Sequence, residues 1–472
     1  MTTTAGLVLV VVLVLFFALL AIRIHVGLSL MASAFVGVLL LRGSGAGVST
    51  VANQPFSTAA AYSLTIIPLF IVMGVFAVRA GLAQAGFDLA STVLRRLPGG
   101  SALASLAGSG LFAAVTGSSV ATVATMARVS TDAIVRAGYT IRLAAGVVCA
   151  GGTLGVLIPP SIVLVLYGVV TEESIGQLLI AGIGPGLLTI AVYAVTIVAL
   201  VAWQRRRAGS RVRETVGSAT VTAPGAHPVA DDTVDAAAAH DTVQDSPQNE
   251  SGRLDILGFC YLGVIFAVSI GTIYLGIATP TEAASFGALA ALITLLLRNR
   301  PPMWLSEIGA SLKDAIGLTA MTFLLMVGAG VFTYVLALSG ASTSLVDLVT
   351  EADLPPYVVL VLCLAILLPM GMFLDGISMI LIAAPLLHPI LTGYGFDGIW
   401  LGVLIVKVAE MALITPPVGM NAFVYSGAVR EAGLGNVFRG IVPFIVADLV
   451  VVALLIAFPA VVTYLPSMSA AQ

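Results

Sequence analysis

The sequence predicts an all-α polytopic membrane protein, built as an inverted repeat in which each half carries a re-entrant helical hairpin and a broken helix. Composition, recurring apolar runs and paired prolines lead to this prediction. Of the 472 residues, 59% are hydrophobic and 9% are charged, whereas about a quarter of the residues in soluble domains are charged. A transmembrane helix needs roughly 20 mostly apolar residues, and the clearest apolar runs lie at 7–20, 28–41, 178–203, 254–274 and 441–462.

The first apolar run, 6–22, is expected to be the first membrane span. It could be mistaken for a secretory signal, but no basic residue precedes it and no small-residue cleavage site with a soluble domain follows it. Segment 1–56 is therefore predicted to hold the N-terminal transmembrane helices of a scaffold.

Charge and ligand chemistry exclude several functions. The formal net charge is −3, and the 20 lysines and arginines are scattered near segment ends, so nucleic acid is not an expected partner. Cys149, Cys260 and Cys363 lie inside apolar stretches without a pairing motif, and the four histidines are far apart. These residues predict neither a disulfide framework nor a zinc site.

Segment 204–253 interrupts the apolar pattern and is predicted to be a disordered polar linker between the two halves. It is rich in Ala, Thr, Asp, Ser and Pro, a composition that cannot bury a core. The positive-inside rule indicates a cytoplasmic linker, because five arginines follow directly after a span: Arg205, Arg206, Arg207, Arg211 and Arg213.

The two halves repeat at a constant offset of 257 residues (416 minus 159) without a gap. The matched positions are Leu97-Pro98 with Leu354-Pro355, Gly138-Tyr139 with Gly395-Phe396, and Pro159-Pro160 with Pro416-Pro417. Recurrence of Pro and Gly in connecting loops is the competing explanation, but it would not hold one register across this distance. We therefore expect a first repeat at 57–203, scaffold helices with an interfacial arm at 254–316, and a second repeat at 317–466.

Each half contains one Pro-Pro pair inside an apolar run, Pro159-Pro160 and Pro416-Pro417. Consecutive prolines remove two backbone donors and cannot continue a helix. At membrane depth such a break is tolerated only inside protein or beside a watery cavity. Transporters built from repeats place their substrate and ion sites at broken helices, so the two pairs predict where a site lies.

A second interruption lies upstream of each pair, at 116–122 and at 371–378, and Ser118 aligns with Asp375. The apolar arms beside the first interruption, 102–114 and 120–126, are too short to span a bilayer singly. Each interruption is therefore predicted to be the tip of a re-entrant hairpin near mid-membrane, so that two tips face two broken helices.

The residue types at these tips and breaks suit a small hard cation and an anionic substrate. Hydroxyls, carbonyls freed by Pro and Gly, one carboxylate and one amide are the oxygen ligands that sodium prefers. Helix starts after Gly117 and Pro160 would offer free N–H groups to a carboxylate. Ser118, Ser119 and Thr122 could equally serve helix packing. Asp375 could cap its helix, although an intramembrane carboxylate usually serves a cation, a proton or a partner.

Other charged positions are expected to have architectural roles. Lys407 and Glu410 lie three residues apart in one apolar helix and are expected to form a structural pair. Segment 279–283 has the pattern of a capped helix start. Two stretches that mix charged or Trp residues with apolar ones, 83–96 and 303–316, are expected to be helices lying along the membrane interface.

Taken together, the motifs resemble those of the large membrane subunit of tripartite ATP-independent periplasmic (TRAP) transporters, the dicarboxylate-permease M type. The resemblance covers nearly the whole chain. It rests on IPLF at 67–70, RRLPGG at 95–100, GSSVAT at 117–122, AGGTLG at 150–155, IPPS at 158–161, YGVVTE at 167–172, TPTEAA at 279–284, GMFLD at 371–375 and TPPVGMN at 415–421.

The resemblance implies an elevator-type secondary transporter of the bacterial inner membrane, driven by a sodium gradient. It would import an organic acid, such as a C4-dicarboxylate or sialic acid, delivered by a soluble extracytoplasmic binding protein. It also implies a small four-helix permease subunit, expected as a separate chain because the first span begins at the chain start.

Carried over by position, the family's functional residues fall into three groups. The first sodium site would comprise Ser118, Ser119, Gly152, Thr153 and Pro159. The second would comprise Asp375, Thr415, Pro416, Gly419 and Asn421. The substrate would lie near Thr122, Ser161 and Asp375.

Two alternatives stay open from the sequence, and the long linker departs from the short connection usual in the family. One alternative is a stand-alone sodium and carboxylate symporter with similar hairpins that needs no binding protein. The other is an intramembrane enzyme, which would need a nucleophile, a base or a metal cluster at membrane depth. The sequence offers no such constellation, so we expect a transporter without enzyme activity whose one cofactor is the coupling sodium ion.

Overall fold

The protein, seen in a computed structural model, is all-helical over the residues that the structure describes, which are 3–94, 96–215, 255–341, 344, 346, 351 and 354–470. The helices of the first half are α1 (Thr3–Ala21), α2 (Val26–Arg42), α3 (Ser44–Ala59), α4 (Ile66–Arg79), α5 (Leu82–Leu94), α6 (Gly100–Thr116), α7 (Ser119–Arg136), α8 (Ile141–Gly152), α9 (Ile162–Thr171), α10 (Ile175–Ala181) and α11 (Ile183–Thr215). Those of the second half are α12 (Ile256–Tyr274), α13 (Pro280–Arg298), α14 (Trp304–Ser339), α16 (Pro356–Met370), α17 (Gly376–Gly393), α18 (Gly398–Ala412), α19 (Met420–Ala428), α20 (Leu434–Ala457) and α21 (Ala460–Ala470).

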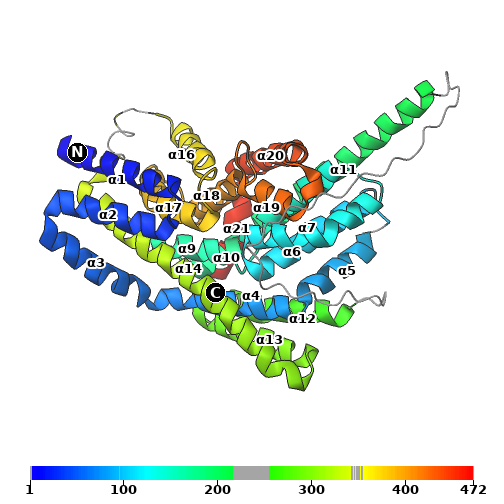
Figure 1. Cartoon of the computed structure of the whole chain (residues 1–472), viewed down its shortest axis with the longest axis horizontal. Coiled ribbons are helices and arrows are strands. Elements are labelled where there is room, and N and C mark those ends of the chain that lie inside the picture. Colours follow the sequence, from blue (N-terminus) through cyan, green and yellow to red (C-terminus); the bar gives the residue numbers. More distant parts are fainter. Residues whose placement is uncertain are drawn as a thin grey trace, which may run out of the picture.

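The helices form an elongated body with the N-terminal helices at one end (Figure 1). Helices α1 to α3 lie at that end, and α5, α6, α7 and α11 lie at the other. The long helix α14 runs diagonally across the molecule and packs against α2, α3 and α4. The middle of the body is made by α9, α17, α18 and α20, where the candidate site lies.

Seven of the described helical segments are long and apolar enough to cross a membrane. They are Tyr62–Arg79, Ile175–Gln204, Ile256–Tyr274, Pro280–Arg298, Pro301–Ser339, Gly376–Gly393 and Leu434–Ala457. Helices α1 and α2 lie where the first two apolar runs were found. The prediction of an all-helical, multi-span membrane protein is confirmed.

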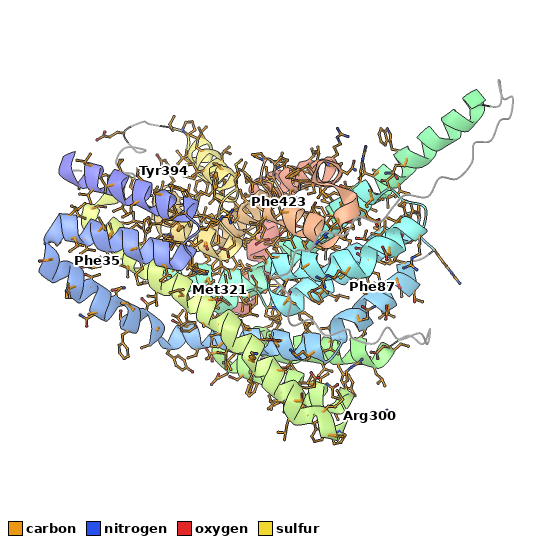
Figure 2. The ribbon with its side chains drawn as sticks, viewed as in Figure 1. Phe35, Phe87, Arg300, Met321, Tyr394 and Phe423 are labelled. Atoms are coloured by element: carbon orange, nitrogen blue, oxygen red, sulfur yellow. The ribbon has the colours of Figure 1, made fainter. Side chains whose placement is uncertain are left out.

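The outer surface is apolar, as expected for a protein whose solvent is lipid. Met321 of α14 is 54% exposed and Phe423 of α19 is 48% exposed; both are labelled in Figure 2. Large exposed apolar side chains also occur on α1, α13 and α20. A soluble monomer rarely exposes so continuous an apolar surface.

The stretch 303–316 differs from its expectation as a separate interfacial helix, because it forms the start of α14. No proline interrupts the chain between Trp304 and Ser339, so one helix of 36 residues continues through it. Arg79 at the end of α4 holds this part of α14 in place, with ion pairs of 2.6 Å to Asp314 and 3.4 Å to Glu307. The other stretch, 83–96, coincides largely with α5.

Helix bounds in the two halves keep the offset found in the sequence. Helices α7 and α17 begin and end at positions that differ by 257 (376 minus 119, and 393 minus 136). Helices α8 and α18 begin at positions with the same difference (398 minus 141). Gly138 and Gly395, which follow α7 and α17, both have φ of 85°, a conformation that glycine adopts readily.

The chain leaves the helical path at both Pro-Pro pairs. After α8 a 3₁₀ turn covers Thr153–Val156, and α9 begins only at Ile162. In the second half α18 ends at Ala412 and α19 begins at Met420. The Pro159–Pro160 and Pro416–Pro417 peptide bonds are both cis.

Three helices are longer than the sequence suggested. Helix α7 continues to Arg136, well beyond the short apolar arm at 120–126, and α17 is by length a possible span. Helix α11 continues past Gln204 to Thr215, into the start of the segment expected to be a linker. The remainder of that linker, 216–253, lies outside the described residues.

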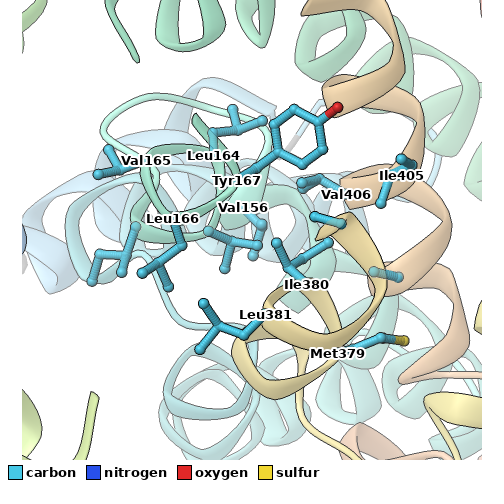
Figure 3. Packing of buried hydrophobic residues seen from close by; sticks show 14 of the residues in the cluster. Val156, Leu164, Val165, Leu166, Tyr167, Met379, Ile380, Leu381, Ile405 and Val406 are labelled. Carbon is cyan, nitrogen blue, oxygen red and sulfur yellow. The ribbon is translucent and has the colours of Figure 1, made fainter. Parts of the chain in front are cut away.

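Helices of the two halves share one core. Figure 3 shows Leu164, Val165, Leu166 and Tyr167 of α9 beside residues of α17 and α18. Tyr167 of α9 also donates a hydrogen bond of 3.2 Å to the Gly398 carbonyl at the start of α18. The first half therefore packs a helix against two helices of the second half.

Candidate functional site

The two predicted tip residues occupy the same position on two helices. Ser118 is the N-cap of α7, and its hydroxyl accepts a hydrogen bond of 3.3 Å from the Ala121 amide. Asp375 is the N-cap of α17, where its carboxylate accepts a hydrogen bond from the Ser378 hydroxyl. Both side chains are half-buried, so each can serve its helix and still face a ligand.

The first tip lies against the start of α9. A Cβ atom placed on Gly117 would lie 3.3 Å from the Ile162 side chain, and Gly117 has φ of 61° as the chain turns into α7. Ser161 is fully buried and caps α9 by accepting a hydrogen bond of 3.2 Å from the Leu164 amide. The tip and the second part of the broken helix are thus neighbours, as the sequence predicted.

Thr122, one turn into α7, is fully buried beside the same tip. Its hydroxyl donates to the Ser118 carbonyl at 2.8 Å and lies 3.3 Å from the Thr116 hydroxyl. Two threonine hydroxyls and the Ser118 carbonyl therefore gather at one turn.

Residues from both halves converge at Gly152. A Cβ atom on Gly152 would lie 3.1 Å from the Ser119 carbonyl oxygen and 3.6 Å from Nδ2 of Asn421. Asn421 is fully buried, and neither atom of its side-chain amide has a hydrogen-bond partner. The sequence grouped Asn421 with the second set of residues, but its side chain lies against the first set.

The other second-half candidates lie at the break between α18 and α19. Thr415 and Pro416 are half-buried, and the Thr415 hydroxyl donates to the Met411 carbonyl at 2.7 Å. Gly419 has φ of 56°, and its Cβ position would lie 3.3 Å from the Thr415 carbonyl oxygen. By contrast, Thr153 and Pro159 at the first break are buried.

Lys407 does not pair with Glu410, so the expected structural pair is wrong. Lys407 forms an ion pair with Asp448 of α20, and both side chains are fully buried. Tyr193 of α11 donates a hydrogen bond of 2.6 Å to the same carboxylate, and its ring lies 5.4 Å from the Lys407 ammonium. Lys407 therefore connects α18 with α20 through Asp448 and with α11 through Tyr193.

The Tyr193 hydroxyl also lies 3.3 Å from the Thr153 hydroxyl. Thr153, a predicted sodium ligand, is thereby connected to the Lys407–Asp448 pair through one tyrosine. Asp448 could have been noticed as a lone carboxylate in the apolar run 441–462, but nothing in the pattern marks Tyr193.

Glu410 contacts Ser119 rather than Lys407, the partner expected from the sequence. Its side chain is 1% exposed, and it accepts a hydrogen bond from the hydroxyl of Ser119, the first residue of α7. A Cβ atom on Gly376, the first residue of α17, would lie 2.7 Å from Oε1 of Glu410. One carboxylate therefore lies at the start of two helices that the chain separates widely.

The donor set favours a hard cation. The polar groups around Gly152 and the two tips are hydroxyl, carbonyl, amide and carboxylate oxygens, which suit sodium. Among the described residues there is no cluster of three or more His, Cys, Asp or Glu side chains that could hold a transition metal. The unpartnered Asn421 amide fits this reading, because a buried amide without a partner is costly.

A separate apolar groove lies between α11 and α20, away from these residues. Its walls include Val195, Trp203, Pro443 and Val450, and none of the predicted site residues lines it. Its composition suits a hydrocarbon chain, so we place the candidate site at the tips and breaks instead.

Membrane-spanning helices, an apolar outer surface and oxygen-rich turns buried between two halves define an all-helical membrane protein of the transporter class. The family model described as "Tripartite ATP-independent periplasmic transporter, DctM component" matches residues 13–461. The chain belongs to this family of transporter permeases, which confirms the resemblance found in its motifs.

Two relatives with named transport functions are similar in sequence to this chain over nearly its full length. The C4-dicarboxylate TRAP transporter large permease protein DctM of Pseudomonas aeruginosa is 34% identical, with 90% of this chain and 89% of that protein covered. The isethionate TRAP transporter permease protein DctMQ of Oleidesulfovibrio alaskensis is 29% identical, with 96% of this chain but 64% of that protein covered.

A solved structure shares the fold. The crystal structure of the YdaH transporter of Alcanivorax borkumensis matches with a TM-score of 0.57, covering 89% of this chain and 90% of that chain. At 15% sequence identity the likeness concerns the fold alone.

Proposed function

We propose that this TRAP permease couples the import of an organic acid to a sodium gradient. The observation that carries the proposal is the convergence at buried Gly152, where the unpartnered amide of Asn421 and the Ser119 carbonyl lie 3.6 Å and 3.1 Å from the position that a Cβ atom would take. Gly152 has no side chain of its own, so these polar groups lie close to its backbone beside the Val123 side chain. Oxygen ligands of this kind suit a small dehydrated cation.

The proposed sodium ligands follow the two tips and the two breaks. The first set is Ser118, Ser119, Gly152, Thr153 and Pro159, and the second is Asp375, Thr415, Pro416, Gly419 and Asn421. The position of Asn421 beside Gly152 supports an exchange between the sets, with the amide serving the first ion. Asp375 would bring a negative charge to the second ion and would face the substrate as well.

The substrate would lie at the first tip. Thr122 and Ser161 are buried there, and the starts of α7 and α9 direct backbone N–H groups toward the same region. The relative from Pseudomonas aeruginosa is a C4-dicarboxylate permease, which supports an organic acid with one carboxylate near these N–H groups.

The movement we propose is of the elevator type, with two re-entrant hairpins arranged as an inverted repeat. The matching bounds of α7 with α17 and of α8 with α18 support the repeat. Segments 57–203 and 317–466 would form the repeats, 1–56 and 254–316 the scaffold, and 204–253 the linker. Bound ions would order the tips, and the substrate would then be carried across together with them.

The chain would work with two partners in the bacterial inner membrane and the space outside it. The match covers 64% of the isethionate TRAP transporter permease protein DctMQ of Oleidesulfovibrio alaskensis. The further permease sequence of that relative supports a small four-helix subunit beside this chain. A soluble binding protein would deliver the acid, in line with the family description as tripartite.

Reconstitution with both partners tests the proposal. Purified protein, small subunit and binding protein in liposomes should take up a labelled C4-dicarboxylate or isethionate only with an inward sodium gradient. Equal uptake without sodium would refute the coupling. Equal uptake without the binding protein would favour the stand-alone symporter instead.

A matched pair of variants tests the site. Asn421→Ala should raise the half-saturating sodium concentration about tenfold or more, because a cation site loses a neutral oxygen ligand. Asn53→Ala, at an exposed asparagine of α3, serves as the control and should leave that concentration unchanged. Equal sodium dependence in both variants would remove Asn421 from the site.

A further inference from the structure

The buried charges of the described chain do not balance. Lys407, Glu410 and Asp448 are the charged side chains found buried among the described residues, at 0%, 1% and 0% exposure. Two carboxylates and one ammonium carry a formal charge of −1. A buried charge without compensation is costly, so the surplus carboxylate needs a partner.

Lys407 is committed to Asp448 rather than to Glu410. Its ammonium forms the ion pair with Oδ1 of Asp448, and Tyr193 donates to that same oxygen at 2.6 Å. The ammonium also lies over the Tyr193 ring. Glu410 is therefore the buried carboxyl group of the cluster that has no cation in direct contact.

The groups in direct contact with Glu410 are neutral or only partly positive, while the charges of Lys407, Asp375 and Asp448 act on it from farther away. The Ser119 hydroxyl donates to Oε2, and the backbone at Gly376 approaches Oε1. Since Ser119 and Gly376 are the first residues of α7 and α17, two helix N-termini lie beside the carboxylate. Their partial positive charges compensate it in part, and a full positive charge would complete the balance.

We propose that Glu410 positions Ser119 for the first sodium ion and supplies the negative charge that balances that ion. A hydroxyl that donates its hydrogen to a carboxylate directs its lone pairs elsewhere, toward a ligand. Partners of this kind, which act on a metal ligand rather than on the metal, set the affinity for the ion. The inference rests on the proposed sodium coupling.

The hydrogen bond between Ser119 and Glu410 also joins the two halves of the protein. Glu410 belongs to α18, before the second break, whereas Ser119 belongs to the first tip. An ion held near Ser119 would therefore be balanced by a residue of the other half. Sodium binding would favour the arrangement in which α7, α17 and α18 meet.

The test compares Glu410→Gln with Glu431→Gln, a substitution at an exposed glutamate. Glutamine keeps the shape and still accepts the Ser119 hydrogen bond, but it removes the charge. We expect a rise of roughly 10- to 100-fold in the half-saturating sodium concentration for uptake. Half-saturation by the organic acid, measured at saturating sodium, should change less than about threefold, since binding of the acid itself is not altered.

A binding measurement on purified protein gives a second readout that does not depend on transport. Sodium should raise the melting temperature of the wild-type protein, because a ligand that binds the folded state stabilises it. The same rise should require correspondingly more sodium in Glu410→Gln. Glu431→Gln should follow the wild type in both measurements.

Ser119→Ala is a second test of the same site. It replaces Glu410→Gln if that variant does not accumulate in the membrane. It should raise the half-saturating sodium concentration as well, and the double variant should lose less than the sum of the two single losses, because the positioning part of the Glu410 effect acts through Ser119. Fully additive effects would mean that Glu410 acts independently of Ser119 and would overturn the positioning role.

The outcomes separate this inference from the proposed function. Sodium-independent uptake by the wild type would refute the coupling itself. If the wild type depends on sodium and Glu410→Gln responds to the same sodium concentrations, the coupling stands and the role of Glu410 is refuted. A variant that melts lower without sodium but binds sodium normally would make Glu410 a helix cap alone.

Discussion

Removal of Lys407 should destabilise the protein more than removal of the whole Lys407–Asp448 pair. Both side chains are fully buried, and Oδ2 of Asp448 has no hydrogen-bond partner, so the carboxylate has little other compensation. Breaking such a pair at one side costs about 3–5 kcal/mol, whereas replacing both partners by apolar residues is often neutral or stabilising. Lys407→Met should therefore cost about 3–5 kcal/mol, and Lys407→Met with Asp448→Leu much less.

Removal of the Tyr193 hydroxyl should lower the free energy of unfolding by less than removal of Lys407. Tyr193→Phe removes a hydrogen bond to a charged acceptor, which contributes about 1.5–3 kcal/mol, while the ring remains. Its loss should also alter the contact with Thr153, 3.3 Å away.

The free energy of unfolding can be measured by reversible unfolding of the purified protein in mixed micelles. Wild type, Lys407→Met, Asp448→Leu and the double variant together form a double-mutant cycle. The reasoning is refuted if the single variants lie within about 1 kcal/mol of the wild type, or if the double variant loses the sum of the two single losses. Tyr193→Phe as costly as Lys407→Met would shift the main role from the ion pair to the tyrosine.

Three further predictions concern other parts of the chain. Asp375→Asn should raise the half-saturating sodium concentration about tenfold or more at unchanged expression, since the proposed second ion loses a charged ligand; unchanged sodium dependence would leave Asp375 as a helix cap. The Arg298 guanidinium lowers the pKa of Asp255, which directly precedes the α12 span, so Arg298→Met should cost up to about 1 kcal/mol at pH 7. That difference should shrink as the pH falls below about 4, because the carboxyl is then protonated in the unfolded and finally in the folded chain; a loss that is constant with pH would contradict the ion pair. Deletion of 219–249 should leave membrane insertion and uptake intact, and an inserted protein without uptake would show that this segment has a role.

Residues that interrupt a helix by their own backbone geometry made the positions of the turns predictable. The Pro-Pro pairs and Gly117 act on their own backbone, so their effect is visible in the sequence without knowledge of neighbours. The shared offset of 257 residues then appeared in the bounds of α7 and α17. Predictions of this kind depend on a few adjacent residues.

Side-chain partners were less predictable, because they depend on which helices pack together. Lys407 and Glu410 are three residues apart, which favoured a pair on one helix. The structure directs Lys407 to Asp448 on α20 and Glu410 to Ser119 on α7. Neither contact leaves a spacing in the sequence, since the partners lie 41 and 291 residues away.

The placement of α9 affects how the protein must be synthesised. This helix has 10 residues, too few to cross a bilayer alone, and most of its side chains are buried against protein. Its neighbours α17 and α18 leave the ribosome only after more than two hundred further residues (376 minus 171). Until then the α9 segment has no final position, so the first half completes its fold only when the second half has entered the membrane.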